Sequence, residues 1–129
     1  MYVAIVDDHA GLREAIAALL EVAGYPSRGF RSAEDFIACP EIGEAACVVV
    51  DEYLPGIDGL ALQRRLAESE ARLPLVFISA HEDTDPAVPA RALREGAIAF
   101  LRKPFHDDEF LGAVQRAWRA GAQRRRGGM

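Results

Sequence analysis

The sequence predicts an α/β fold in which a parallel five-stranded sheet carries helices on both of its faces. Short apolar runs rich in β-branched residues alternate five times with longer segments whose apolar residues recur at helical spacing. This alternation is typical of strand–helix units that build one parallel sheet. The runs are apolar at almost every position, as expected of strands covered on both faces. The length of 129 residues fits one such domain.

The strands are expected where the apolar runs stand, and two of these runs end in acidic residues. The second run is short and only weakly apolar, so it predicts a short strand. Because crossovers between parallel strands are right-handed, each helix should pack on the sheet and return the chain to its starting end. The expected strands are residues 2–7, 25–30, 46 or 47–51, 75–79 and 98–102.

The helices are predicted from the spacing of apolar residues together with start and stop signals. Gly24 and Gly96 are expected to end the first and fourth helices, since glycine readily adopts the conformation that follows a helix. Ser32 suits the capping position of the second helix, and Asp85-Pro86 suits the start of the fourth. The remaining expected bounds are residues 11–22 and 107–120 for the first and last helices, 1–121 for the domain, and 122–129 for a flexible polar tail.

Composition excludes several classes of partner. The formal net charge of −5 argues against direct binding of nucleic acid by this domain. No apolar stretch approaches the roughly 20 residues of a membrane-spanning helix, so no membrane partner is expected. The chain enters a strand at once and meets acidic residues at position 7, which is unlike a signal peptide. We therefore expect a cytoplasmic protein.

Acidic residues and one lysine stand where three of the apolar runs end. Asp7-Asp8 closes the first run, Asp51 closes the third, and Lys103, the one lysine of the chain, follows the fifth. Because ligands of parallel α/β sheets bind beyond the carboxyl ends of the strands, these side chains are expected to share one pocket. Carboxylates repel each other by roughly 4 kcal/mol per pair at 4 Å and an effective dielectric of 20. A hard divalent cation such as Mg²⁺ would relieve that repulsion.

Five motifs follow one another along the chain: Val6-Asp7-Asp8-His9, Asp51 followed by the loop 54–59, Ser79-Ala80, Gly96-Ala97 and Lys103-Pro104-Phe105. Taken together, they resemble the receiver domain of two-component response regulators over about residues 2–120. Each motif alone is weak, and their order and spacing carry the resemblance. It implies a flavodoxin-like doubly wound sheet with strand order 2-1-3-4-5, which puts the ends of the first and third strands at the switch point.

The resemblance implies that Asp51 accepts a phosphoryl group from a sensor histidine kinase and forms an acyl phosphate. Mg²⁺ would be the cofactor. Asp8 and Asp51 would bind it directly, the backbone carbonyl of Tyr53 would be a further ligand, and Asp7 would act through a water. Singly, an Asp-Asp pair after a strand could instead be a charge pair at a helix N-terminus.

Other site residues are also implied by the resemblance. Lys103 and Ser79 would bind the phosphoryl oxygens, and Phe100 would be the aromatic residue that rotates when Ser79 moves. Phe100 could instead be a simple core residue of its strand. Pro104 resembles the cis proline of the family, which would aim Lys103 into the pocket.

The expected function is a phosphorylation switch rather than an enzyme. The switched face would be formed by the helix after Asp85-Pro86, the strand 98–102 and the helix 107–120, and it would dimerise or bind an effector. The motifs resemble receivers that precede helix-turn-helix output domains, so transcription regulation is the expected pathway. Whether the domain acts alone or within a DNA-binding regulator is left open by the sequence.

Two rival functions and several departures from the family remain. A Mg²⁺-dependent phosphohydrolase could use the same aspartyl chemistry, and a receiver-like interaction module could work without phosphorylation. Glu52 stands where the family commonly has an apolar residue, and Tyr53 could shield the phosphoryl group from water. The segment 81–89 is longer than is typical of the family. We expect solvent-facing or capping roles for the histidines, which are His9, His81 and His106.

Overall fold

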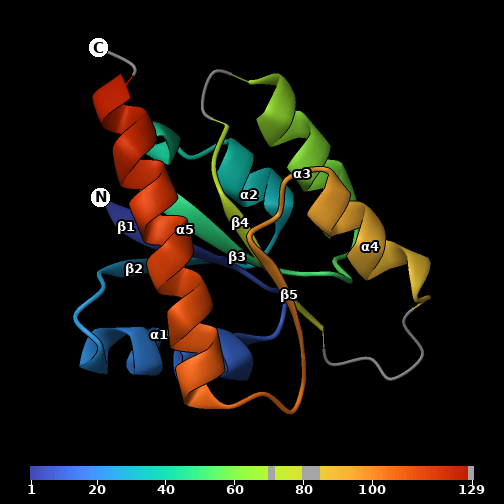
Figure 1. Ribbon diagram of the computed structural model, residues 1–129, viewed down its shortest axis with the longest axis horizontal. Coiled ribbons are helices and arrows are strands. Elements are labelled where there is room, and N and C mark those ends of the chain that lie inside the picture. The colour runs from blue at the N-terminus through green and yellow to red at the C-terminus, as the bar shows by residue number, and fades with distance from the viewer. Residues whose placement is uncertain (70–71, 80–84, 128–129) are drawn as a thin grey trace.

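A five-stranded parallel sheet forms the centre of the computed structural model, which describes residues 1–69, 72–79 and 85–127 (Figure 1). The strand order is β2-β1-β3-β4-β5 and all neighbouring strands are parallel, so the predicted topology is confirmed. Every residue of β1 and β4 is buried, which explains why these runs are apolar except at Ser79, the last residue of β4. The strands are β1 (Tyr2–Val6), β2 (Ser27–Phe30), β3 (Ala45–Asp51), β4 (Leu75–Ser79) and β5 (Ala99–Arg102).

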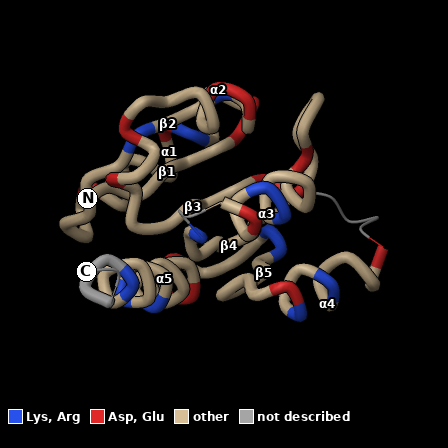
Figure 2. Tube along the Cα trace, turned by 90° about the horizontal axis from the view of Figure 1, so that it is seen from above, with Lys and Arg blue, Asp and Glu red and all other residues tan. Residues whose placement is uncertain are grey.

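Helices cover both faces of the sheet, and each face has its own apolar core. On one face, Ile16 and Leu20 of α1 pack with Phe110 of α5 against the sheet. On the other face, Phe36 of α2 and Leu62 of α3 belong to a second cluster. Charged residues lie mainly on the helices and loops around the sheet (Figure 2). The helices are α1 (Ala10–Val22), α2 (Ala33–Ile37), α3 (Gly59–Glu68), α4 (Ala87–Arg94) and α5 (Asp107–Gly127), with a 3₁₀ turn, η1 (Ile42–Glu44), before β3.

Side-chain caps set the start of several helices. The hydroxyl of Ser32 accepts the N–H of Asp35 at 3.0 Å, which confirms its predicted role at the start of α2. Asp85 accepts the N–H of Ala87 at 2.9 Å in the first turn of α4. His9 caps α1, as described below. The local sequence therefore marks where these helices begin.

The last helix is longer than the sequence indicates. The prediction ended it near residue 120, but α5 continues to Gly127, so the expected tail is helical over residues 122–127. Gly121 looks like a stop signal, yet it lies buried inside the helix. A side chain there would collide with the backbone of Ala46 in β3, so glycine is needed for close packing rather than for ending the helix. The following alanine, glutamine and arginines have good helix propensity.

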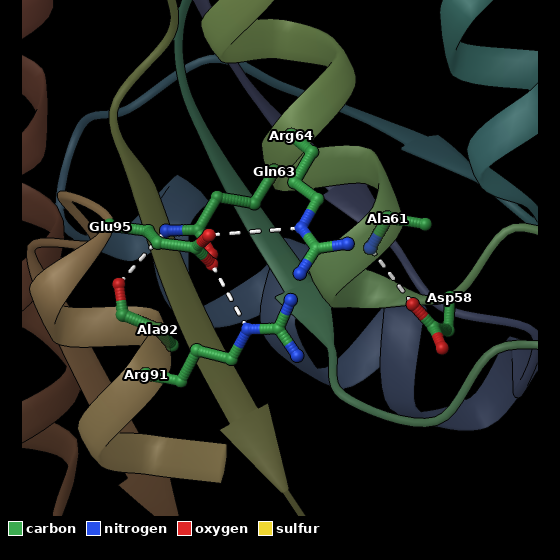
Figure 3. A network of polar contacts seen from close by, with 7 residues as sticks. All are labelled: Asp58, Ala61, Gln63, Arg64, Arg91, Ala92 and Glu95. Atoms are coloured by element: carbon green, nitrogen blue, oxygen red, sulfur yellow. Dashed lines mark hydrogen bonds and ion pairs between the residues drawn. The ribbon is translucent and has the colours of Figure 1, made fainter.

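Contacts between α3 and α4 hold α4 on its face of the sheet (Figure 3). The buried Gln63 side chain donates its Nε2–H to the carbonyl of Ala92 at 2.9 Å. The carboxylate of Glu95 lies 3.7 Å from the guanidinium of Arg64 and 3.6 Å from that of Arg91. Because exposed ion pairs contribute little, the buried amide contact is expected to be the stronger link.

Candidate functional site

Two acidic residues follow β1 in very different environments. Asp7 is fully buried and Asp8 is exposed. One carboxylate oxygen of Asp7, Oδ1, accepts the backbone N–H of His9 at 2.7 Å, and the Asp7 carbonyl accepts Nη1–H of Arg13 at 2.7 Å. The other oxygen, Oδ2, is buried and has no hydrogen-bond partner among the described residues. A buried carboxylate oxygen without a partner is costly, and a bound cation would compensate that cost.

Asp51 ends the central strand β3 beside these acids. Its Oδ1 accepts the backbone N–H of Tyr53 at 3.0 Å. Burial raises the pKa of the Asp51 carboxyl to about 6, and the nearby charges of Asp7 and Asp8 act in the same direction. The N–H of Tyr53 opposes this shift of the pKa. The site therefore disfavours a third negative charge as long as no cation is bound.

The ends of three strands meet around one cavity. Asp7, Asp8 and Asp51 each place a carboxylate oxygen within 4.8 Å of the other two. The cavity beside them has a volume of about 500 Å³, and Lys103 reaches it from the end of β5. The structure thus brings together four residues from three segments that lie far apart in sequence. The cavity is lined by Asp7, Asp8, His9, Leu12, Asp51, Tyr53 and Lys103.

The three carboxylates fit a divalent cation. Mg²⁺ prefers oxygen ligands and keeps several of its waters, so a sparse set of acids beside an open cavity suits it. The exposed Asp8 and the half-buried Asp51 offer oxygens toward the same place as the buried Asp7. The partnerless Oδ2 of Asp7 adds to this fit.

The β5–α5 loop presents the lysine. The backbone N–H of Lys103 donates to the carbonyl of Ser79 at 2.8 Å, which ties the loop to the end of β4. The Lys103–Pro104 peptide bond is cis, as the resemblance implied. The Lys103 side chain is exposed and lines the acidic cavity.

Ser79 and Phe100 lie on the neighbouring strands. Ser79 is buried at the end of β4. Phe100 of β5 is half-buried and stacks on Phe77 of β4, with ring centroids 5.7 Å apart. Among the described residues, neither Ser79 nor Phe100 belongs to the lining of the acidic cavity. Ser79 follows Ile78, the β4 residue that pairs with Asp51 of β3.

For some residues near the site, the sequence predicted only part of what the structure shows. The capping role expected for the histidines is confirmed at His9, whose Nδ1 accepts the N–H of Leu12 at 3.2 Å. Its presence in the acidic cavity was not predicted, although its position directly after Asp8 was a signal. Glu52 is buried, and Gly59 packs so closely on this segment that an added Cβ would lie 2.9 Å from the Asp51 carbonyl oxygen. His81 and the other residues of 80–84, which precede α4, lie outside the described residues.

The chain belongs to the response regulator receiver domain family, whose model matches residues 3–115. Response regulator protein TmoT of Ectopseudomonas mendocina is 37% identical over 123 residues, which cover 94% of this chain and 54% of that protein. Response regulator protein TodT of Pseudomonas putida is 35% identical over 121 residues, covering 94% of this chain and 52% of that protein. The chain thus spans about half the length of these relatives.

Solved structures agree with this family. The response regulator StyR matches with a TM-score of 0.87 and 36% identity, over 98% of this chain and 63% of that one. FixJ-N matches with a TM-score of 0.80 and 30% identity, over 92% of this chain and 94% of that one. The predicted flavodoxin-like fold is therefore confirmed. Within the described part of the chain, no helix combines the length and apolar character needed to cross a membrane.

Proposed function

We propose that this domain is a phosphorylation switch in which Asp51 accepts a phosphoryl group from a sensor histidine kinase. The observation that carries the proposal is the convergence of Asp7, Asp8 and Asp51 within 4.8 Å beside a cavity that Lys103 also lines. A carboxylate can attack phosphorus, and the end of a central strand mounts Asp51 rigidly for that attack. One carboxylate oxygen would form the new bond while the electron pair of the broken bond leaves with the donor.

The acidic residues would hold Mg²⁺ beside the acceptor. Asp8 and Asp51 would bind it directly, with the backbone carbonyl of Tyr53, and Asp7 would act through a water. The ion would supply positive charge that stabilises the phosphoryl oxygens during transfer. The N–H of His9 keeps the Asp7 carboxylate oriented, and Tyr53 does the same for Asp51.

Lys103 and Ser79 would bind the oxygens of the phosphoryl group once it is on Asp51. The exposed Lys103 side chain already lines the cavity, whereas Ser79 would have to move toward it. The backbone N–H of Lys103 donates to the carbonyl of Ser79 and so connects the loop after β5 to the end of β4. A movement of either residue would therefore move both segments. Phe100 would then change its packing on Phe77, and the face of α4, β5 and α5 would change with it. That face would dimerise or bind an effector.

The kinase would dock in a groove next to the acceptor. A mostly apolar groove of about 470 Å³ runs between α1 and the β5–α5 loop, and it shares Leu12 and Lys103 with the acidic cavity. Val22 on this face of α1 is 88% exposed. A kinase segment seated in the groove would lie beside Asp51, which phosphoryl transfer requires. We therefore assign this groove to the kinase.

The switch would work in the cytoplasm, and the domain itself would bind neither nucleic acid nor membrane. Its relatives include proteins named as transcriptional regulatory proteins, TdiR of Thauera aromatica among them. This supports a role in transcription regulation through a partner or an output domain. The domain would thus be a signalling domain that is modified rather than an enzyme that turns over a substrate.

The proposal is tested by intact-mass measurement after incubation with acetyl phosphate and Mg²⁺. Wild type is expected to gain one phosphoryl group, and Asp51→Asn is expected to gain none. Asp58→Asn is a matched control, because Asp58 caps α3 in the same loop and asparagine also caps helices. It should gain the group as wild type does.

Two other results would favour the rival functions. If wild type gains no mass, a phosphorylation-independent interaction module becomes the better assignment. If the protein hydrolyses a simple phosphate ester many times per molecule, a phosphohydrolase becomes the better assignment. Such enzymes usually carry a second acid two residues after the nucleophile, where this chain has Tyr53.

A further inference from the structure

His9 lines the acidic cavity and makes local hydrogen bonds through both its ring and its backbone. Its Nδ1 accepts the N–H of Leu12 at 3.2 Å and so caps α1. Its own backbone N–H donates to Asp7 at 2.7 Å. The ring also lies against Gly11, where an added Cβ would be 3.2 Å from the ring carbon Cε1. The hydrogen bond to Leu12 therefore sets the orientation of this exposed ring.

The capping hydrogen bond decides which ring nitrogen carries the proton. A nitrogen that accepts a hydrogen bond has no hydrogen of its own, so the neutral ring carries its proton on Nε2. His9 lines the acidic cavity together with Asp51 and Lys103. Nε2–H is thus the group through which this ring can bind a ligand there. The carboxylates of the cavity only accept, whereas a phosphoryl group brings oxygens that need donors.

We propose that His9 is a substrate-binding residue whose Nε2–H donates to an oxygen of the incoming phosphoryl group. This inference rests on the proposed function of Asp51. During transfer, the bond between phosphorus and the donor breaks, its electron pair leaves with the donor, and an oxygen of Asp51 forms the new bond. His9 keeps its proton throughout. Its role is to orient the phosphoryl group between Lys103 and the acceptor.

Two variants of His9 separate binding from capping. His9→Ser keeps an oxygen that can cap α1, as the Ser32 hydroxyl caps α2, but it removes the Nε2–H donor of the imidazole ring. His9→Gln keeps an N–H at about the distance of Nε2 but is a poor cap. We expect His9→Ser to unfold at the wild-type urea midpoint and to accept the phosphoryl group about three- to ten-fold more slowly. We expect His9→Gln to lose stability and to keep most of the wild-type rate.

The measurements are the rate of mass gain with acetyl phosphate and with phosphoramidate, and the urea midpoint of each variant. His106→Ser is the matched control, because His106 lies outside the acidic cavity, and it should keep the wild-type rate. A wild-type rate in His9→Ser would overturn the inference and leave His9 as a cap only. If wild type itself gains no phosphoryl group at Asp51, the proposed function fails and the inference fails with it.

Discussion

Gly121 provides a direct test of how α5 packs on the sheet. Replacing it with alanine would place a Cβ in collision with the carbonyl oxygen of Ala46 and 2.8 Å from the carbonyl carbon. Both atoms belong to the backbone of β3, the central strand that ends at Asp51, so no side chain can rotate out of the way. The helix itself would have to move away from the sheet.

The expected loss follows from two opposing effects. Favourable carbon–carbon contacts lie at about 3.5 to 4.0 Å, so α5 would shift by roughly 1 Å and lose packing against β3. Overpacking of this kind costs roughly 1 to 3 kcal/mol, and a rigid backbone obstacle favours the upper part of that range. Alanine also has a better helix propensity than glycine, which returns about 1 kcal/mol. We therefore expect Gly121→Ala to lower the free energy of unfolding by about 2 kcal/mol.

Gly112 supplies the matched control in the same helix. A Cβ at this position meets no described atom within 4 Å, so Gly112→Ala should gain up to about 1 kcal/mol from helix propensity alone. Urea unfolding followed by far-UV circular dichroism measures the free energy of unfolding of both variants. The dependence of that free energy on urea concentration should be the same for both. If Gly121→Ala proves as stable as Gly112→Ala, the close approach of α5 to β3 is wrong.

Three further predictions concern the site and the α3–α4 contact. Asp51 has a folded-state pKa of about 6 against an ordinary 3.8, so the folded state holds this proton more tightly and stability falls as pH rises through that window. Without divalent cations, the free energy of unfolding of Asp51→Asn should therefore be about 1 to 2 kcal/mol higher than that of wild type at pH 7, with no difference below about pH 4. Mg²⁺ should stabilise wild type more than the variant. If the stabilities of the two proteins depend on pH in the same way, this prediction is contradicted. Tyr53→Ala should shorten the half-life of the phosphorylated form by admitting water, and equal half-lives in a mass time course would end the shielding hypothesis. Gln63→Ala should lower the free energy of unfolding by about 2 kcal/mol, because it removes a buried hydrogen bond to Ala92. Arg64→Ala should lower it by less than about 0.5 kcal/mol, because it removes only an exposed ion pair. Equal losses in urea unfolding would show that the amide contact is not the stronger link.

The sequence by itself determined the strand–helix alternation and the location of the chemistry. Apolar runs with β-branched residues are local signals, and the predicted strand 75–79 coincides with β4. Asp7, Asp8, Asp51 and Lys103 were found because parallel strands present their carboxyl ends at one edge, a rule that needs no coordinates. The cis peptide bond at Pro104 followed from the family resemblance rather than from local preference.

The tertiary structure alone decided how these residues interact. The burial of Asp7 beside an exposed Asp8 depends on how α1 and β2 cover the end of β1, which no local pattern records. The raised pKa of Asp51 depends on burial and on distances between segments more than 40 residues apart. Gly121 carries the same sequence signal as a helix stop, and only the approach of β3 reveals it as a packing residue. Periodicity and capping act over a few residues, whereas burial and charge interactions act through space, so only the folded chain determines them.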